Sequence, residues 1–250
     1  MDLGLEGRTA LVMGASRGIG RAVAESLSRE GARVALCSRN REALEQVAAG
    51  LPGESAVFEA DSTDLERLTR LPGEVDAALG PLEILVVNTG GPPPGGALDN
   101  AKEEWEQAYR SLVLAPKALI EASIGGMRER GWGRVVNVAS SSVREPIAGL
   151  ALSNAHRMAT VGLFKTLATE VAGDGITINT VGTGRFATDR LAQMYGSIEA
   201  AEAQAAQDVP AGRLGQPEEY GDLVAFICSE RAAYLTGTVI PLDGGLLKSA

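Results

Sequence analysis

The stretch GASRGIG, residues 14–20, decides the fold. It follows an apolar run, Thr9–Met13, that is typical of a buried strand, and it leads into a helical pattern from Arg21 to about Glu30. Glycines at such a junction allow a tight turn and let the backbone approach a pyrophosphate, which the N–H groups of the new helix then face. The stretch therefore predicts a dinucleotide site. The residues assigned to the cofactor here are Gly14, Ser16, Arg17, Gly18, Ile19 and Gly20.

Short apolar runs rich in Val, Ile and Leu recur along the chain and alternate with segments of helical length. Because the runs are continuously apolar, both faces of each strand are expected to be buried, as in a parallel sheet. Repeated strand–helix units predict an α/β, Rossmann-type doubly wound parallel sheet of about seven strands with helices on both faces, as one domain over residues 1–250. The predicted strands are Thr9–Met13, Arg33–Cys37, Ala56–Phe58, Ile84–Val87, Arg134–Val138, Thr177–Val181 and Thr238–Pro241.

Two irregular stretches are expected to line a site. Residues 90–96 read Gly-Gly-Pro-Pro-Pro-Gly-Gly, follow a strand end and cannot be helical. A late excursion at about residues 185–212, with a helix around Glu199–Gln207, suits a lid or substrate loop over a pocket.

Bulk composition narrows the class of protein. The net charge of −9 argues against a nucleic-acid partner, because binding to phosphate backbones requires a basic face. Two cysteines, Cys37 and Cys228, are too few for a disulfide framework and suit a reducing compartment. The first residues lack the layout of a signal peptide, and no apolar run approaches the ~20 residues of a membrane span. We therefore expect a cytoplasmic protein with no membrane partner, and we predict no metal site.

With its G-x-x-x-G-x-G spacing, the chain resembles the short-chain dehydrogenase/reductase family, and within it the 3-oxoacyl-acyl-carrier-protein reductases, over essentially its whole length. The residues that carry the resemblance beyond the glycine stretch are Asp61, Asn88-Thr89-Gly90, Gly133–Ser140, Tyr234-Leu235-Thr236-Gly237 and Asp243-Gly244-Gly245. The resemblance implies that Asp61 accepts from the adenine amino group and that Asn88 and Gly90 lie beside the adenosine ribose. It also implies that Phe186 and Thr188 hold the nicotinamide carboxamide.

The choice between NADP(H) and NAD(H) depends on the end of the second strand. An acid there would bind the ribose 2′-hydroxyl of NAD and repel a 2′-phosphate. Ser38 stands where the family's NAD-selecting Asp would be, and the guanidinium forks of Arg39 and Arg17 suit a phosphate. The alternative is that both arginines are ordinary solvated charges. We predict NADP(H) in preference to NAD(H).

The catalytic residues are where the sequence departs from the family. Members of the family use Ser, Tyr, Lys and Asn. Ser140 matches the Ser, but the resemblance places Ser153 at the Tyr position and Arg157 at the Lys position, with Leu112 at the Asn position. A serine hydroxyl is a far weaker acid than a phenol, whose pKa is about 10. We expect Ser140, Ser153 and Arg157 to orient the substrate and the ribose, with the proton delivered through water or His156.

Two tyrosines are alternative proton donors. Tyr195 lies in the expected lid, and Tyr109 lies one helical turn before Leu112, where a packing role explains it more easily. Family resemblance also implies a homotetramer or homodimer built on the helices Trp105–Ser123 and Ser153–Val171. The leucines that would fit such an interface are Leu112, Leu114, Leu119 and Leu163, which in a monomer would simply be core.

Two functions remain open at this point. The first is an NADP(H)-dependent oxidoreductase that transfers a hydride to or from a carbonyl or hydroxyl compound, either a small molecule or an acyl thioester. The second is a catalytically silent NADP(H)-binding regulatory or partner protein, which the replacement of Tyr, Lys and Asn together would suit.

Overall fold

The computed structural model describes residues 1–249, and seven strands of this part of the chain form one parallel sheet in the order β3-β2-β1-β4-β5-β6-β7. From β1 the strand order runs outward to β3 on one side, and from β4 it runs outward to β7 on the other. The topological switch point therefore lies between β1 and β4, and the crevice at the carboxyl ends of these two strands is the expected ligand site. The fold class predicted from the sequence is confirmed. The strands are β1 (Thr9–Met13), β2 (Arg33–Ser38), β3 (Ser55–Glu59), β4 (Leu82–Val87), β5 (Gly133–Val138), β6 (Ile176–Thr183) and β7 (Val239–Leu242).

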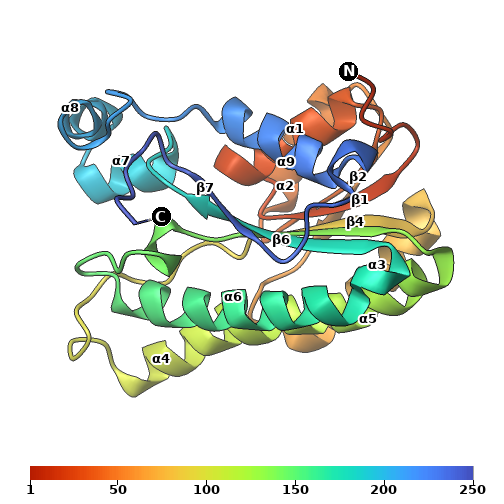
Figure 1. Ribbon diagram of the computed structural model, residues 1–250, viewed down its shortest axis with the longest axis horizontal. Coiled ribbons are helices and arrows are strands. Elements are labelled where there is room, and N and C mark those ends of the chain that lie inside the picture. The colour runs from red at the N-terminus through yellow and green to blue at the C-terminus, as the bar shows by residue number, and fades with distance from the viewer. Residues whose placement is uncertain (250) are drawn as a thin grey trace.

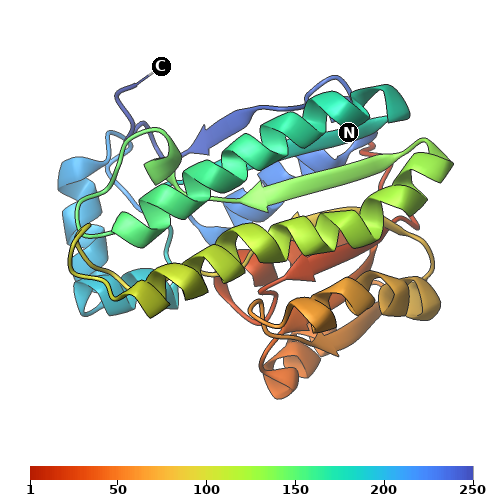
Figure 2. The same ribbon diagram turned by 90° about the horizontal axis from the view of Figure 1, so that it is seen from below.

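Helices cover both faces of the sheet (Figure 1). Three of them pack on one face: α1 (Gly18–Arg29), α2 (Arg41–Gly50) and α9 (Pro217–Cys228). The other face carries α3 (Leu65–Leu79), α5 (Ala115–Arg130) and α6 (Ala151–Val171). Figure 2 shows α5 and α6 lying side by side across that second face. Burial from both sides explains why central strands such as β1 and β4 are largely apolar, while the edge strands β3 and β7 are only half-buried.

The helix expected over Trp105–Ser123 is interrupted. It consists of α4 (Lys102–Tyr109), a π-helical turn (Arg110–Leu114) and then α5, with Pro116 in the first turn of α5. Such turns are rare and often occur at functional sites. Leu112 lies buried inside the turn.

Two of the leucines expected at a subunit interface are instead part of the core. Leu112 is 3% exposed and Leu119 is fully buried within its own chain, so neither can contact a partner. For these two residues the core alternative holds, because apolar periodicity shows that a face is covered but not by which chain. Leu114 and Leu163 are half-buried.

The segment after β6 forms two short helices, α7 (Asp189–Tyr195) and α8 (Ile198–Asp208). They lie beyond the carboxyl ends of the strands (Figure 1), at the expected crevice. The helix predicted around Glu199–Gln207 is confirmed as α8, whereas α7 was not expected. Ala201 and Ala205 of α8 form a small separate apolar cluster with residues that follow it.

Among residues 1–249, no helix has the length and apolar character needed to cross a membrane, including the 21-residue α6. Within the same residues, no group of His, Cys, Asp and Glu side chains is arranged to hold a metal ion.

Alkaline conditions should destabilise the fold through its two thiols. Cys37 and Cys228 are buried, and burial raises the pKa of each thiol to about 12. Above about pH 9 the unfolded chain loses these protons while the native chain keeps them, so the free energy of unfolding falls by up to about 1.4 kcal/mol per pH unit for each thiol. Urea unfolding at a series of pH values from about 8 to 11 should show this slope, and Cys228→Ala should reduce it. A slope unchanged in the variant would contradict the assignment.

Candidate active site

The turn between β1 and α1 has the shape that a pyrophosphate requires. Gly14 has a φ of +63°, and a Cβ on Gly20 would overlap the Gly14 carbonyl oxygen and lie 2.9 Å from Nδ2 of Asn88. Above the turn there is room: a Cβ on Gly18 would meet nothing closer than the Thr188 methyl group at 3.4 Å, and one on Gly90 nothing within 4 Å. The turn is therefore tight within the protein and open toward the crevice, as a bound phosphate needs.

The structure brings Ser38, Arg39 and Asp61 together at the ends of β2 and β3. The Arg39 guanidinium lies 3.7 Å from the Asp61 carboxylate, and Ser38 Oγ accepts from the backbone N–H of Asn40 at 3.3 Å. Asp61 accepts from the backbone N–H and the hydroxyl of Thr63 at 2.7 and 2.8 Å, and these bonds lower its pKa. A carboxylate held in this way suits an acceptor for an amino group.

Arg17 does not join Arg39 in this structure. Its guanidinium lies 3.6 Å from the carboxylate of Asp189, the first residue of α7. Both arginines are mostly exposed, and exposed ion pairs of this kind contribute about 0–1 kcal/mol. Either guanidinium can therefore exchange its carboxylate partner for a phosphate.

Ser140 and Ser153 lie on two elements that Arg157 connects. Ser140 follows β5 and accepts from the Ser142 backbone N–H at 3.1 Å. Ser153 is buried in the first turn of α6, and Arg157 is one turn further along. Arg157 Nε donates to Ser153 Oγ at 3.2 Å, and its Nη1 donates to the carbonyl of Val138, the last residue of β5, at 2.9 Å.

A third bond fixes the Arg157 guanidinium to the loop after β4, where Nη2 donates to the carbonyl of Gly90. Burial and, to a smaller extent, the nearby charge of Arg190 lower the pKa of Arg157 to about 10. At neutral pH the group therefore still carries its positive charge. The result is a fixed cation at the carboxyl ends of β4 and β5, in contact with Ser153.

His156 lies on a different side of α6. Its Nδ1 is 2.8 Å from the Leu152 carbonyl, and its ring packs against Trp105 and Tyr109 of α4, with centroid distances of 5.3 and 6.3 Å. These contacts hold it in the packing between two helices, whereas the adjacent Arg157 turns toward the sheet. The other alternative, Tyr195, lies with its ring 5.7 Å from the Arg185 guanidinium, beside α8.

Phe186 and Thr188 lie in the turn that leads from β6 to α7. Phe186 is buried with its ring edge-on to Tyr220 at 5.4 Å. Thr188 caps α7, since its hydroxyl accepts from the Leu191 N–H at 3.4 Å, and its methyl group faces Gly18. Thr188 thus lies over the glycine turn, where the first turn of α7 meets the first turn of α1.

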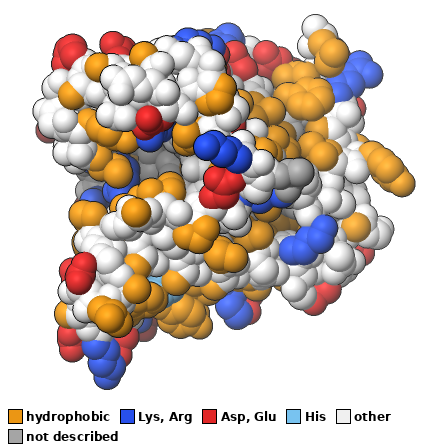
Figure 3. Space-filling view, turned by 60° about the vertical axis from the view of Figure 1, so that its left-hand side comes forward, with side chains coloured by type: hydrophobic (Ala, Val, Ile, Leu, Met, Phe, Trp, Pro, Cys, Tyr) orange, Lys and Arg blue, Asp and Glu red, His pale blue; other side chains and the backbone are white. Residues whose placement is uncertain are grey.

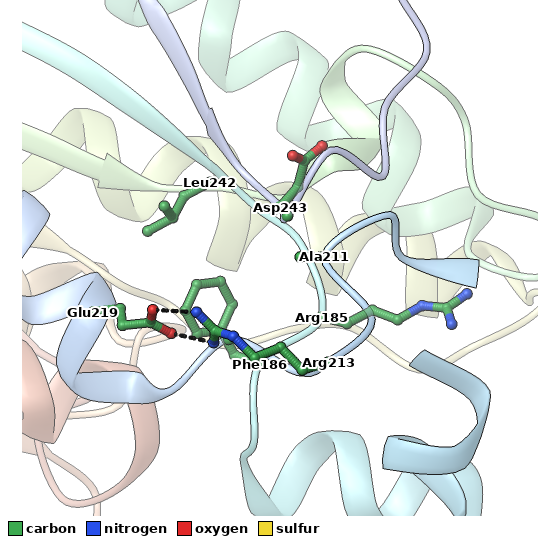
Figure 4. Close-up of a pocket in the computed structure, with 9 residues that line it drawn as sticks. Arg185, Phe186, Ala211, Arg213, Glu219, Leu242 and Asp243 are labelled. Carbon is green, nitrogen blue, oxygen red and sulfur yellow. Dashed lines mark hydrogen bonds and ion pairs between the residues drawn. The ribbon is translucent and has the colours of Figure 1, made fainter. Parts of the chain in front are cut away.

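Two hollows open near this turn. The first, about 150 Å³, lies between Phe186, Asp243 and an ion pair of Arg213 with Glu219 at 2.7 Å (Figure 4). The Arg213 guanidinium and the N–H of Gln216 lower the pKa of Glu219 to about 2. At this hollow Arg213 pairs with Glu219 and Arg185 pairs with Asp208, while the Asp243 carboxylate accepts from the backbone N–H groups of Gly245 and Leu247. The second, about 320 Å³, lies between α1, the start of α7 and the start of α9, with Gly18 and Thr188 in its lining.

One basic residue at the site was missed from the sequence. Arg190 of α7 reaches the loop at residues 90–96 and donates to the carbonyls of Gly91 and Pro92, at 3.2 and 3.3 Å. Its position two residues after Thr188 was the only signal available. Nothing in the residue pattern indicates that the loop would curve toward it.

Known proteins match this chain over nearly its whole length. A family model described as enoyl-(acyl carrier protein) reductase matches residues 14–247. The 3-oxoacyl-[acyl-carrier-protein] reductase of Haemophilus influenzae is 33% identical over 245 residues, covering 98% of this chain and 100% of that protein. The structure of L-sorbose reductase from Gluconobacter frateurii, complexed with NADPH and L-sorbose, matches with a TM-score of 0.94 at 30% identity, covering 100% of both chains. YwfH, an NADPH-dependent reductase involved in bacilysin biosynthesis, matches with a TM-score of 0.93 at 29% identity, covering 97% of this chain and 99% of that one.

Proposed function

Since this chain belongs to the short-chain dehydrogenase/reductase family, we propose that it is an NADP(H)-dependent oxidoreductase with an atypical active site, acting on a carbonyl or hydroxyl compound. The observation that carries the proposal is the position of Arg157, whose guanidinium joins Ser153, the end of β5 beside Ser140, and Gly90 after β4. A fixed cation that contacts the Ser153 hydroxyl thus lies at the carboxyl ends of β4 and β5, and Ser140 follows β5 at the same edge of the sheet.

The residues present fit a dinucleotide. The open face of the turn at Gly14–Gly20 and the first N–H groups of α1 would hold the pyrophosphate. The adenosine would lie along Asp61, Asn88 and Gly90, and the nicotinamide carboxamide would meet Phe186 and Thr188. When bound, the nicotinamide supplies or accepts the hydride.

The chain's own contribution is orientation and charge. The hydroxyls of Ser140 and Ser153 would bond the substrate oxygen, and the positive charge of Arg157 would stabilise the negative charge that develops there as hydride arrives. The proton would come from water, because neither serine is a useful acid near neutral pH. His156 is a poorer candidate than the sequence suggested, since its contacts are with α4 rather than with either serine.

The segment with Leu112 is consistent with altered proton delivery. The backbone carbonyl of Leu112 accepts from the Thr160 hydroxyl at 2.5 Å, and this bond attaches the π-helical turn to α6. An apolar side chain at this position cannot hold a relay water. We therefore place the water nearer the crevice mouth, beside Ser153.

Cofactor preference gives the first prediction for this proposal. Removing the guanidinium in Arg39→Ala should weaken NADPH binding roughly tenfold or more, because a charge-assisted bond to the 2′-phosphate is lost, and should leave NADH binding unchanged. Calorimetric titration with each nucleotide measures both. Arg41→Ala is the matched control, since Arg41 pairs with Glu45 one turn away on the exposed side of α2. An equal loss for both nucleotides would contradict the assignment of Arg39 to the 2′-phosphate.

Activity is tested by NADPH consumption against 3-oxoacyl thioesters and small ketones, with the folded, NADPH-bound protein. Turnover of any of these, lost in Ser140→Ala, is the expected result. Binding of NADPH without turnover across the panel would instead favour the silent regulatory or partner protein.

A further inference from the structure

Two guanidinium groups share one short loop at the crevice. Arg157 of α6 donates to the carbonyl of Gly90, and Arg190 of α7 donates to the carbonyls of Gly91 and Pro92. Three consecutive carbonyls of the loop are therefore bonded by two cations that come from different helices. The face turned forward in Figure 3 is hollowed on its left side, and Lys or Arg side chains (blue) lie at that hollow.

Neither cation is neutralised by the part of the chain that the structure describes. All the ion pairs found among residues 1–249 involve other basic residues, so neither Arg157 nor Arg190 has a carboxylate within 4 Å there. Burial lowers the pKa of both groups, and the charge of Arg190 adds to the effect on Arg157. Two like charges held together in a crevice are unfavourable, and such arrangements are concentrated at functional sites.

Both guanidinium groups also have N–H donors that make none of these hydrogen bonds. A guanidinium has five N–H donors. Arg157 uses one on each nitrogen, which leaves one on Nη1 and one on Nη2, while Arg190 uses one on Nη1 and one on Nη2 and keeps Nε free. Backbone carbonyls fix the position of the cations without cancelling their charge. The free donors can therefore bond an incoming anion.

The loop is shaped to accept Arg190. A Cβ on Gly91 would overlap the Arg190 guanidinium and lie 2.8 Å from its Nη1, so only glycine leaves the guanidinium in place. Three prolines follow and stiffen the loop. Gly95 then bonds to the start of α6, donating to Gly149 at 2.7 Å and accepting from Ala151 at 3.1 Å. The loop is thus fastened to the helix that carries Arg157.

We propose that Arg157 and Arg190 together bind a carboxylate of the substrate, so that the substrate is a small oxo acid or the corresponding hydroxy acid. This rests on the proposed oxidoreductase function and names its substrate class. In the reducing direction, hydride from NADPH forms the new C–H bond at the carbonyl carbon as the C=O π bond opens onto oxygen. A water molecule then gives that oxygen its proton and leaves hydroxide, which takes a proton from the solvent; NADP⁺ is released, and the carboxylate is unchanged.

The pyrophosphate of the cofactor is a second anion that would bind in this crevice. The contacts of α7 separate its site from the site proposed for the substrate carboxylate. Thr188 lies against Gly18 of the glycine turn, and Asp189 pairs with Arg17 of the same turn. Arg190 turns the other way, to the loop beyond Gly90, where Arg157 and Ser153 lie. Its position therefore favours the substrate side of the crevice.

The test uses matched acids and methyl esters: pyruvate, acetoacetate and levulinate against methyl pyruvate, methyl acetoacetate and methyl levulinate. The NADP⁺-bound protein is titrated with each by calorimetry, and NADPH consumption is followed in parallel. At least one acid should bind tenfold or more tightly than its ester. Arg190→Met should remove that difference with a roughly 10- to 100-fold rise in KM, while Arg190→Lys keeps part of it.

Two further variants sharpen the test. Gly91→Ala displaces the guanidinium without removing it and should reproduce the loss of acid preference. Arg70→Met on the exposed surface of α3 makes the same change in net charge and should have no effect. Failure of every acid to bind, or equal binding of acids and esters, would overturn the proposal, as would an Arg190→Met variant that loses NADPH affinity and nothing else. Turnover of esters and acids alike would overturn it while leaving the oxidoreductase function intact.

Discussion

Gly20→Ala is expected to weaken cofactor binding strongly and to destabilise the fold. The added Cβ would overlap the carbonyl oxygen of Gly14 and lie 2.7 Å from its carbonyl carbon, and both atoms belong to backbone that cannot rotate away. The turn or the start of α1 must shift, which separates the N–H groups that would face the pyrophosphate. A displacement of this size should weaken NADPH binding about a hundredfold, and overpacking should lower the free energy of unfolding by about 1–3 kcal/mol.

Calorimetric titration with NADPH and urea unfolding measure the two effects separately. Gly73→Ala is the matched control: Gly73 is exposed inside α3, and a Cβ there would meet nothing within 4 Å. That control should leave NADPH binding unchanged and stabilise the fold by about 0.5–1 kcal/mol, because alanine is the better helix former. A Gly20→Ala protein that binds NADPH as the parent does would show that the nucleotide lies elsewhere.

Arg157→Met is expected to lower kcat/KM roughly 100- to 1,000-fold, the range found when a preorganised donor to a developing negative charge is removed. The change removes the bonds to Ser153, Val138 and Gly90 together with the only cation that contacts Ser153 in the described structure. The loss should appear in kcat, because the charge on the substrate oxygen develops during hydride transfer, and also in KM, because the substrate carboxylate loses one of its two cations.

Arg157→Lys separates charge from geometry. Its ammonium keeps a positive charge but cannot bridge three acceptors in one plane, so we expect it to recover only part of kcat. Steady-state kinetics of both variants, with far-UV circular dichroism as a check on folding, give the comparison. If Arg157→Met kept the parent kcat, the guanidinium would be a structural bridge and not part of the chemistry.

Much of the fold was predictable because its signals are local. Turn chemistry identifies residues 14–20, and apolar runs identify central strands such as β1 and β4, which are buried on both faces. The breaks in regular structure were less predictable. The π-helical turn at Arg110–Leu114 leaves no mark in the apolar pattern, and α7 is too short to show a period.

The candidate site was partly predictable for the same reason. Ser140, Ser153 and Arg157 could be named from their spacing, but the direction of each side chain depends on tertiary packing. His156 and Arg157 are neighbours in sequence, yet one packs on α4 and the other bonds to the end of β5. The contact of Arg190 with the loop at residues 90–96 could not be predicted, because it depends on the path of that loop, and no periodic pattern in the sequence indicates this path.

The most direct test is transfer of deuterium from NADPH labelled at the reactive carbon of the nicotinamide, read by mass spectrometry of the product after one turnover with the ketone, thioester and oxo-acid panel. We predict one deuterium on the carbon that was the carbonyl carbon of the substrate, with the parent protein carrying Ser153 and Arg157 as they stand. The contradicting result is a protein saturated with NADPH that labels no product, while a Ser153→Tyr, Arg157→Lys double variant does.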